Sequence, residues 1–103
     1  MIDLIYQGQK LKMVQSRYRN NMATYLGLFT EDGEPFADIT VNTPYSAINA
    51  IVLDYDFLDL EEDFKSNIIN YLTDGKVCDI DAGFITLPKY WLNLKVLDEI
   101  EEL

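Results

Sequence analysis

The chain of 103 residues is long enough for one domain, residues 1–103, and too short for a second independent hydrophobic core. Apolar residues make up 49% of it, which excludes a disordered chain, and no apolar run approaches the roughly 18 residues of a transmembrane helix. Eighteen acidic and eight basic residues give a net charge of −10, which disfavours direct binding to nucleic acid or anionic lipid.

The charge is distributed unevenly along the chain. Residues 1–30 hold four basic residues and one acid, whereas residues 31–103 hold four basic residues and 17 acids. A strongly acidic surface attracts basic patches on other proteins, so the expected partner is a basic protein surface. The first residues show no basic segment followed by an apolar one, and the single cysteine, Cys78, allows no intrachain disulfide, so we expect a cytoplasmic protein.

The first 41 residues predict four antiparallel strands that follow one another as a meander. Alternating or β-branched and aromatic residues occupy the expected strands, at 2–6, 11–18, 23–30 and 35–41. Turn residues separate them, with Gly8 in the first turn, Asn20 and Asn21 in the second, and Gly33 in the third.

The next segment predicts a strand followed by one amphipathic helix. Residues 47–57 alternate so that Asp54 and Asp56 face outward from a strand. We expect Asp59 to be the N-cap of the helix and Glu62 to complete a capping box. The apolar stripe recurs every four residues, at Leu60, Phe64, Ile68 and Leu72, and Gly75 fits the position after the helix end.

The remaining residues predict short strands at 77–80 and 84–87 and a short terminal helix over 94–103. Strands that come first and helices that come later indicate an α+β fold. We therefore expect an antiparallel β-sheet, with an N-terminal meander of about four strands, one amphipathic helix packed on it and a short C-terminal helix.

The stretch DYDFLDLEED, residues 54–63, places six carboxylates in ten positions. Two interpretations stay open: the acids are a solvated strand face and helix start, where they complement the helix dipole, or they contact a cationic partner. EF-hand spacing is not met, because Leu58 and Lys65 stand where calcium ligands are needed. We expect no metal and no cofactor.

The residue types argue against an enzyme. The chain has no histidine, no P-loop and no dinucleotide fingerprint, and Cys78 between apolar and acidic neighbours is expected to be buried. The tyrosines and the tryptophan favour core and protein contacts, since only Arg17, Tyr18 and Arg19 form a basic and aromatic cluster of the kind that stacks nucleic-acid bases.

One segment resembles a known family. Residues 31–42 contain Glu31, Asp32, Gly33, Glu34, Pro35, Ala37, Thr40, Val41 and Asn42 of an EDGEPxAxxTVN block. With Tyr6 and Gly8, the basic and aromatic element at 17–19, and a GFxxxP motif at Gly83, Phe84 and Pro88, the chain resembles small proteins of phages and conjugative elements of Gram-positive bacteria over about residues 4–90. That family is a domain of unknown function, so the resemblance assigns no catalytic residue.

The resemblance implies a setting in which small acidic proteins inhibit host defence. Our leading hypothesis is a non-enzymatic protein-binding inhibitor, an anti-CRISPR of a Cas9-type effector or another anti-defence protein that mimics nucleic acid or blocks its loading. The expected contact residues are Asp54, Tyr55, Asp56, Asp59, Glu61, Glu62, Asp63 and Trp91. The alternatives are an accessory module for protein interaction and a nucleotide or small-ligand sequestrator that uses Arg17, Arg19 and tyrosines. The protein is expected to be a monomer or a homodimer.

Overall fold

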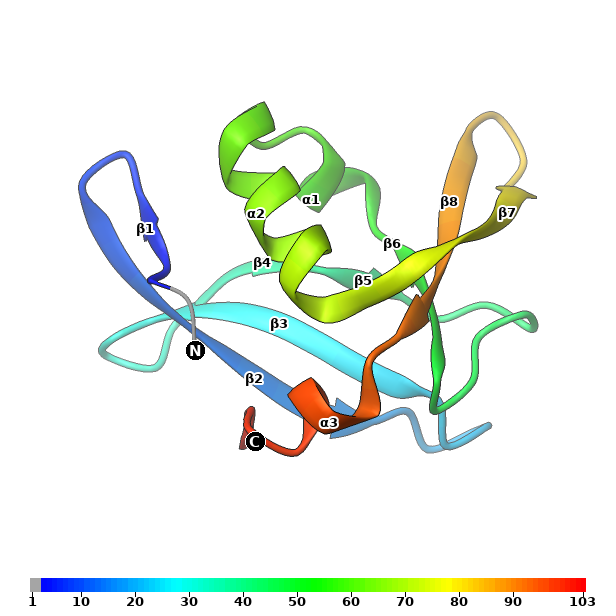
Figure 1. Ribbon diagram of the computed structural model, residues 1–103, viewed down its shortest axis with the longest axis horizontal. Coiled ribbons are helices and arrows are strands. Elements are labelled where there is room, and N and C mark those ends of the chain that lie inside the picture. The colour runs from blue at the N-terminus through cyan, green and yellow to red at the C-terminus, as the bar shows by residue number, and fades with distance from the viewer. Residues whose placement is uncertain (1–2) are drawn as a thin grey trace.

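The computed structural model describes residues 3–103, which form two sheets and three helices (Figure 1). The first sheet contains four antiparallel strands in chain order, β1 (Ile5–Tyr6), β2 (Gln9–Arg17), β3 (Thr24–Thr30) and β4 (Pro35–Asp38). This meander confirms the predicted one; Ile2, the first residue of the predicted β1 segment, lies outside the described residues.

The turn between β1 and β2 follows from two residues. Tyr6 pairs with Gln9, so Gln7 and Gly8 form a two-residue loop with φ angles of 50° and 81°. A type I′ turn needs positive φ at both central residues, and it matches the right-handed twist of the strands that it joins. Gly8 therefore lies in the turn that the sequence predicted.

The chain crosses into the second sheet at Ile39, which is fully buried. The Ile39 amide donates to the carbonyl of Leu26 in β3 (2.9 Å), while its own carbonyl accepts from the amide of Asp54 (2.9 Å). The predicted strand 35–41 is thus divided between β4 and β5 (Thr40–Val41). The second sheet, absent from the sequence prediction, has the order β5, β6 (Ala50–Leu53), β8 (Thr86–Leu92) and β7 (Thr73–Asp81).

The prediction of one strand over residues 47–57 holds only for Ala50–Leu53; residues 47–49 form a turn, and the strand ends at Leu53. Asp54 caps a short helix, α1 (Tyr55–Leu58), because its carboxylate accepts from the amide of Asp56 (2.8 Å). Phe57 of α1 is fully buried in the core. A capped turn that buries an aromatic ring is more stable here than two further strand residues with no neighbouring strand.

The predicted amphipathic helix is present as α2 (Glu62–Leu72), with Ile68 and Leu72 buried. Its predicted start is wrong, because Asp59 is the C-cap of α1 and Glu61 is the N-cap of α2, with no side-chain capping bond. Its predicted end near Thr73 is confirmed, but the prediction of Gly75 as the residue just after the helix is wrong. Thr73 ends α2, and its hydroxyl donates to the carbonyl of Ile69 (2.8 Å).

Strands β7 and β8 are longer than predicted and project from the body as a hairpin (Figure 1). The prediction of Phe84 and Ile85 as strand residues is wrong, because β8 begins at Thr86 and these two residues lie in the loop before it. Gly75 belongs to β7, has φ +140° and lies at a register shift, so it serves a β-bulge. Cys78 is exposed on β7, which contradicts its prediction as a buried residue. Its strand lies at the sheet edge, where the outer face has no covering layer.

The last ten residues contain less helix than predicted. Helix α3 (Leu94–Leu97) is followed by β9 (Glu101–Glu102), which pairs in parallel with β2, Glu101 opposite Val14. Gln15, only 5% exposed, explains the difference, since its side-chain amide donates to the carbonyls of Leu97 (2.6 Å) and Ile100 (2.7 Å). These bonds satisfy carbonyls at the end of the helix and turn the chain back along β2.

One core joins both sheets and the three helices. Its buried residues come from the first sheet and from the elements that follow it: Leu11, Met13, Leu26, Leu28, Ile39, Ile51, Leu53, Phe57, Ile68, Leu72, Leu92 and Leu97. Helix α2 covers this core on one side, and the first sheet covers it on the other (Figure 1). The start of α2 and the whole of α1 are consequently held at the surface in fixed positions.

Candidate acidic interface

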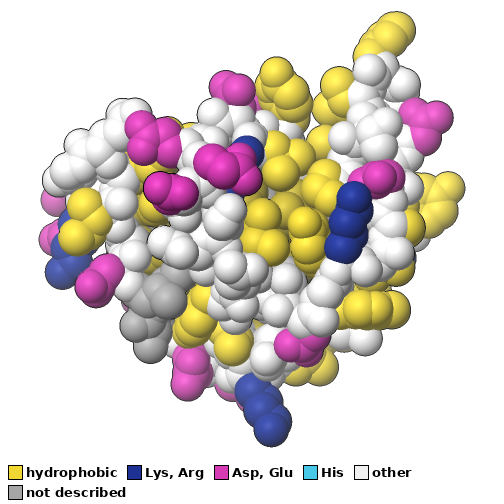
Figure 2. Space-filling view, turned by 45° about the horizontal axis from the view of Figure 1, so that its top comes forward, with side chains coloured by type: hydrophobic (Ala, Val, Ile, Leu, Met, Phe, Trp, Pro, Cys, Tyr) yellow, Lys and Arg dark blue, Asp and Glu magenta, His cyan; other side chains and the backbone are white. Residues whose placement is uncertain are grey.

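Six carboxylates lie on α1, on the turn after it and on the first residues of α2. We call this set the acidic face; it consists of Asp54, Asp56, Asp59, Glu61, Glu62 and Asp63. All are exposed except Asp54, which is half-buried. Figure 2 shows acidic side chains gathered beside the apolar centre of this side of the molecule. The predicted acids therefore lie on α1, its caps and the first residues of α2 instead of along a strand.

Internal bases neutralise little of the acidic face. Within residues 3–103, the ion pair made by this set joins Glu62 to Lys65 (3.1 Å). The Lys65 ammonium also donates to the carbonyl of Leu58 (2.6 Å), which fixes it at the end of α1. Six carboxylates against one ammonium leave an excess of five negative charges, the condition for long-range attraction of a cationic partner.

Two of the acids also have structural roles. Asp54 caps α1, while the Glu61 carboxylate accepts from the side-chain amide of Gln7 (3.1 Å), and the Glu61 amide donates to the Tyr6 hydroxyl (3.2 Å). Glu62 and Asp63 lie in the first turn of α2, where carboxylates complement the helix dipole. The first sequence interpretation thus holds for part of the set, and Asp56, Asp59 and Asp63 have no side-chain partner among the described residues.

Asp54 is affected by its acidic neighbours. Burial raises the pKa of Asp54 above its ordinary value, the hydrogen bond from the Asp56 amide opposes this rise, and the charges of Asp56 and Asp38 add to it. Charge repulsion and partial burial both disfavour the ionised form. Asp56 and Asp38 therefore lie close enough to Asp54 to disfavour its ionisation.

Asp38 lies near Asp54, although it was not among the predicted contact residues. Its carboxylate accepts from the Tyr25 hydroxyl (2.7 Å), and burial followed by this bond raises the pKa of Tyr25. The sequence places Asp38 on a strand 16 residues before Asp54. Only the crossing at Ile39, whose carbonyl accepts from the Asp54 amide, brings the two acids together. No local sequence signal reports that crossing.

The two predicted aromatic contacts lie far apart. Tyr55 is 55% exposed at the start of α1, within the acidic face. Trp91 is 46% exposed on β8 and pairs with Ala50, at the opposite end of β6 from Asp54. Ala50 and Asp54 are four residues apart along the strand, which corresponds to about 13 Å. The structure thus places Tyr55 among the acids and leaves Trp91 outside the acidic face.

Basic residues do not form a comparable surface. Lys10 pairs with Glu31 (3.9 Å), Lys12 with Glu101 (3.9 Å) and Lys76 with Asp79 (2.7 Å). Arg17 lines a hollow of about 330 Å³ whose other described residues are Gln15, Ser16, Glu102 and Leu103. No tyrosine is among the residues described around it, so the grouping of arginine and tyrosine that a nucleotide sequestrator would use is not formed there.

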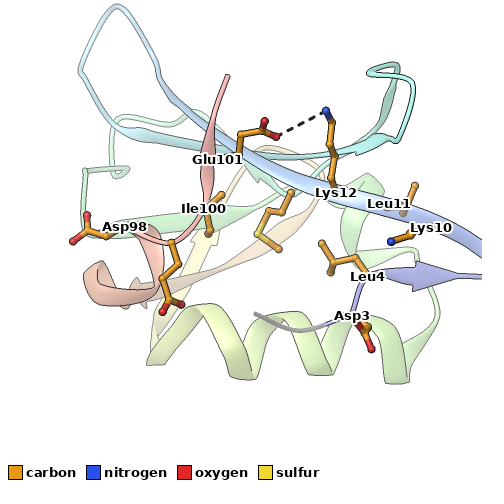
Figure 3. Close-up of a pocket in the computed structure, with 10 residues that line it drawn as sticks. Asp3, Leu4, Lys10, Leu11, Lys12, Asp98, Ile100 and Glu101 are labelled. Carbon is orange, nitrogen blue, oxygen red and sulfur yellow. Dashed lines mark ion pairs between the residues drawn. The ribbon is translucent and has the colours of Figure 1, made fainter.

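Another hollow among the described residues lies between β2 and the segment before β9 (Figure 3). It has a volume of about 640 Å³ and an apolar floor that includes Leu4, Leu11 and Ile100. Lys12 and Glu101 at its edge pair with each other, as the dashed line in Figure 3 marks. Lys10, which also lines the hollow, pairs with Glu31 outside it, so both lysines of the lining are engaged in ion pairs.

Metal and membrane sites are also absent from the described part of the chain. Among residues 3–103, no group of three or more cysteine, aspartate or glutamate side chains is arranged to hold a metal ion. None of the helices described is both long and apolar enough to cross a bilayer.

Comparisons of the chain with models of protein families, with curated proteins and with solved structures find no match. The resemblance to the phage and conjugative-element family therefore stays a prediction based on the motifs of the sequence.

Proposed function

We propose that this protein is a non-enzymatic protein-binding inhibitor whose acidic face docks on a cationic surface of its partner. The observation that carries the proposal is the arrangement of the acidic face. Six carboxylates lie within ten residues on α1, its caps and the start of α2, Tyr55 of α1 is exposed, and Lys65 is the one base paired with these acids among residues 3–103.

A surface of this kind can attract a positively charged protein and bind it selectively. An excess of negative charge accelerates association with a positively charged surface, and salt weakens the attraction. Tyrosine adds apolar contact area and a hydroxyl, which makes it frequent at protein interfaces. The carboxylates do not need to move to meet a row of lysine and arginine side chains, because α1 is capped and Phe57 fixes it in the core.

The finer proposal concerns the partner. A cationic channel built to hold nucleic acid presents the charge that the acidic face complements. The resemblance to a family of mobile elements adds a setting in which such a channel belongs to a defence effector of the Cas9 type. The protein would then occupy part of the channel and hinder the binding of guide RNA or DNA.

The test is a binding titration against a purified Cas9-type effector, with and without guide RNA, at about 0.1 and 0.5 M salt. The native protein is expected to bind the effector without guide RNA more tightly and to lose affinity at the higher salt concentration. The variant Asp56→Asn/Asp59→Asn/Asp63→Asn removes three carboxylates with no internal side-chain partner. We expect it to bind about tenfold more weakly at 0.1 M salt, and less so at 0.5 M salt.

A matched control separates a local effect from net charge. Asp32→Asn/Glu34→Gln/Asp98→Asn changes the net charge by the same amount at exposed positions outside the acidic face. It should retain the affinity of the native protein within about threefold. Equal weakening by both variants would show that the acids act only through overall charge, and binding insensitive to salt and to both variants would reject the proposed mechanism.

A further inference from the structure

The hairpin of β7 and β8 ends in an apolar tip, residues 82–85. Phe84 in this tip is completely exposed, at 107% of its reference area, and Ile85 is 40% exposed. Val77, on the neighbouring strand, is 36% exposed. Figure 1 shows the hairpin projecting beside α1, and Figure 2 shows hydrophobic side chains at its outer end. Val77 lies opposite Lys89 and Tyr90, away from the loop, so the tip itself presents the adjacent pair Phe84 and Ile85.

The tip holds Phe84 in one place. Asp81 pairs with Thr86, and the Ala82 amide donates to the Ile85 carbonyl (2.9 Å), which leaves Gly83 and Phe84 as the two loop residues. Gly83 has φ +86°, the left-handed region that a type II′ turn requires at its first central position. A tight turn presents an aromatic ring with little backbone entropy left to lose on binding.

The hairpin is also fixed relative to the acidic face. Leu58 of α1 packs against the small buried cluster of Val52, Ile80 and Leu87, and the last two of these belong to β7 and β8. Because the same helix carries Tyr55 and Asp56, this contact joins α1 to the part of the hairpin next to its tip.

The charges around the tip indicate what it meets. Asp79 is paired with Lys76 (2.7 Å), whereas Asp81, directly before the tip, is exposed and has no ion pair within residues 3–103. An apolar ring next to a carboxylate complements an apolar pocket that is bordered by lysine or arginine. A bilayer of anionic lipid would be repelled by the net charge of −10.

We infer that the hairpin tip is the apolar anchor of the interface, with Phe84 inserted into a pocket of the partner protein that basic side chains border. The inference rests on the proposed function, since the partner is the same cationic protein. It assigns to Phe84 the role that the sequence gave to Tyr55 or Trp91. Aromatic residues that fill a pocket are frequent hot spots of binding energy, while surrounding charges set rate and specificity.

The experiment compares Phe84→Ser with Tyr45→Ser in the titration against the Cas9-type effector, at both salt concentrations. Tyr45 is a matched control, because its ring is 58% exposed on a loop outside the hairpin. Phe84→Ser should weaken binding about 30-fold, equally at both salt concentrations, and Tyr45→Ser should change it less than threefold. The triple acidic-face variant should instead reduce the dependence on salt.

These outcomes distinguish the two proposals. If the native protein binds in a salt-dependent way and Phe84→Ser binds equally well, the anchor is rejected and the proposed function stands. If the native protein does not bind the effector, both are rejected. Sedimentation with neutral phosphatidylcholine vesicles and light scattering of the protein alone complete the test. Vesicle binding or dimer formation that Phe84→Ser abolishes would assign the tip to a membrane or to a second copy, and would overturn the inference.

Discussion

The last ten residues and the hairpin tip both lie in the C-terminal part of the chain, but the first segment buries apolar side chains and the second exposes one. Residues 94–103 turn inward: Leu97 and Ile100 are buried, and Gln15 satisfies their carbonyls. The hairpin tip points outward with a fully exposed aromatic ring. Buried residues such as Leu97 stabilise the fold, whereas an exposed residue such as Phe84 can be replaced with little loss of stability. The exposed residues are the ones that a partner can reach.

The largest expected effect tests the inward half of this comparison. Leu97→Ala removes a side chain that is buried in the core, so the free energy of unfolding should fall by about 2–5 kcal/mol. Urea denaturation followed by circular dichroism measures it. Leu94→Ala changes the same residue type in the same helix at an exposed position, and it should cost less than about 1 kcal/mol. Equal losses would mean that α3 does not pack as described.

A smaller loss is expected from Gln15→Leu. This substitution keeps the size of the side chain and leaves the carbonyls of Leu97 and Ile100 without their donor, at a cost of about 2 kcal/mol. It should also accelerate hydrogen exchange of the Leu103 amide, which donates to the Gln15 carbonyl. Gln9→Leu, at an exposed position of the same strand, is the control. Unchanged exchange at Leu103 would contradict the role of Gln15.

Asp54→Asn examines the border between the two kinds of residue, because Asp54 both caps a helix and belongs to the acidic face. Asparagine preserves the cap and removes a charge that burial, Asp56 and Asp38 disfavour. Stability at neutral pH should therefore rise, by less than about 1 kcal/mol.

The sign of the pH dependence follows from the raised pKa of Asp54. The folded protein holds this proton at a higher pH than the unfolded chain does, so the native protein loses stability as pH rises from the ordinary aspartate pKa through the raised one. Below both values the advantage of Asp54→Asn should disappear. Denaturation at several pH values measures this; an advantage that grows toward acid pH would contradict it.

The smallest expected effect tests the outward half. Phe84→Ser removes a ring that is fully exposed, so the free energy of unfolding should change by no more than about 0.5 kcal/mol. The same denaturation series checks it. A loss above about 1 kcal/mol would show that the ring packs on the body of the protein, and would remove the distinction between the tip and the last ten residues.

The parts of the fold that local sequence signals determine could be predicted. Gly8 and the alternation of the first 41 residues predicted the meander, and the four-residue spacing of Leu60, Phe64, Ile68 and Leu72 predicted α2. The α+β class and the order of these elements followed from them. In each case the decisive residues lie within a few positions of one another.

The parts that depend on distant residues could not be predicted in the same way. The crossing at Ile39 depends on bonds to Leu26 and Asp54, and the end of α3 depends on Gln15. Helix α1 left a local signal that was not used, since Leu53 and Leu58 occupy the positions of a hydrophobic staple around the cap Asp54. Asp59 offered a competing cap five residues later.

The candidate site was predictable to a similar extent. The six acids were identified from the sequence, and the structure places them on α1, its caps and the start of α2. Asp38 was missed because its nearness to Asp54 depends on the crossing between sheets. Phe84 was predicted as a strand residue and noted in a motif, but its exposure could not be predicted, because that depends on whether anything packs over the turn.

The parallel pairing of β9 with β2 has a consequence for the synthesis of the chain. Val14 leaves the ribosome long before its partner Glu101, 87 residues later, which at 5–20 residues per second is a delay of about 4–17 s. During that time the backbone groups of β2 opposite β9 are open to pairing with other nascent chains. Slower translation before residue 100 would therefore lengthen the period in which this edge of β2 can aggregate.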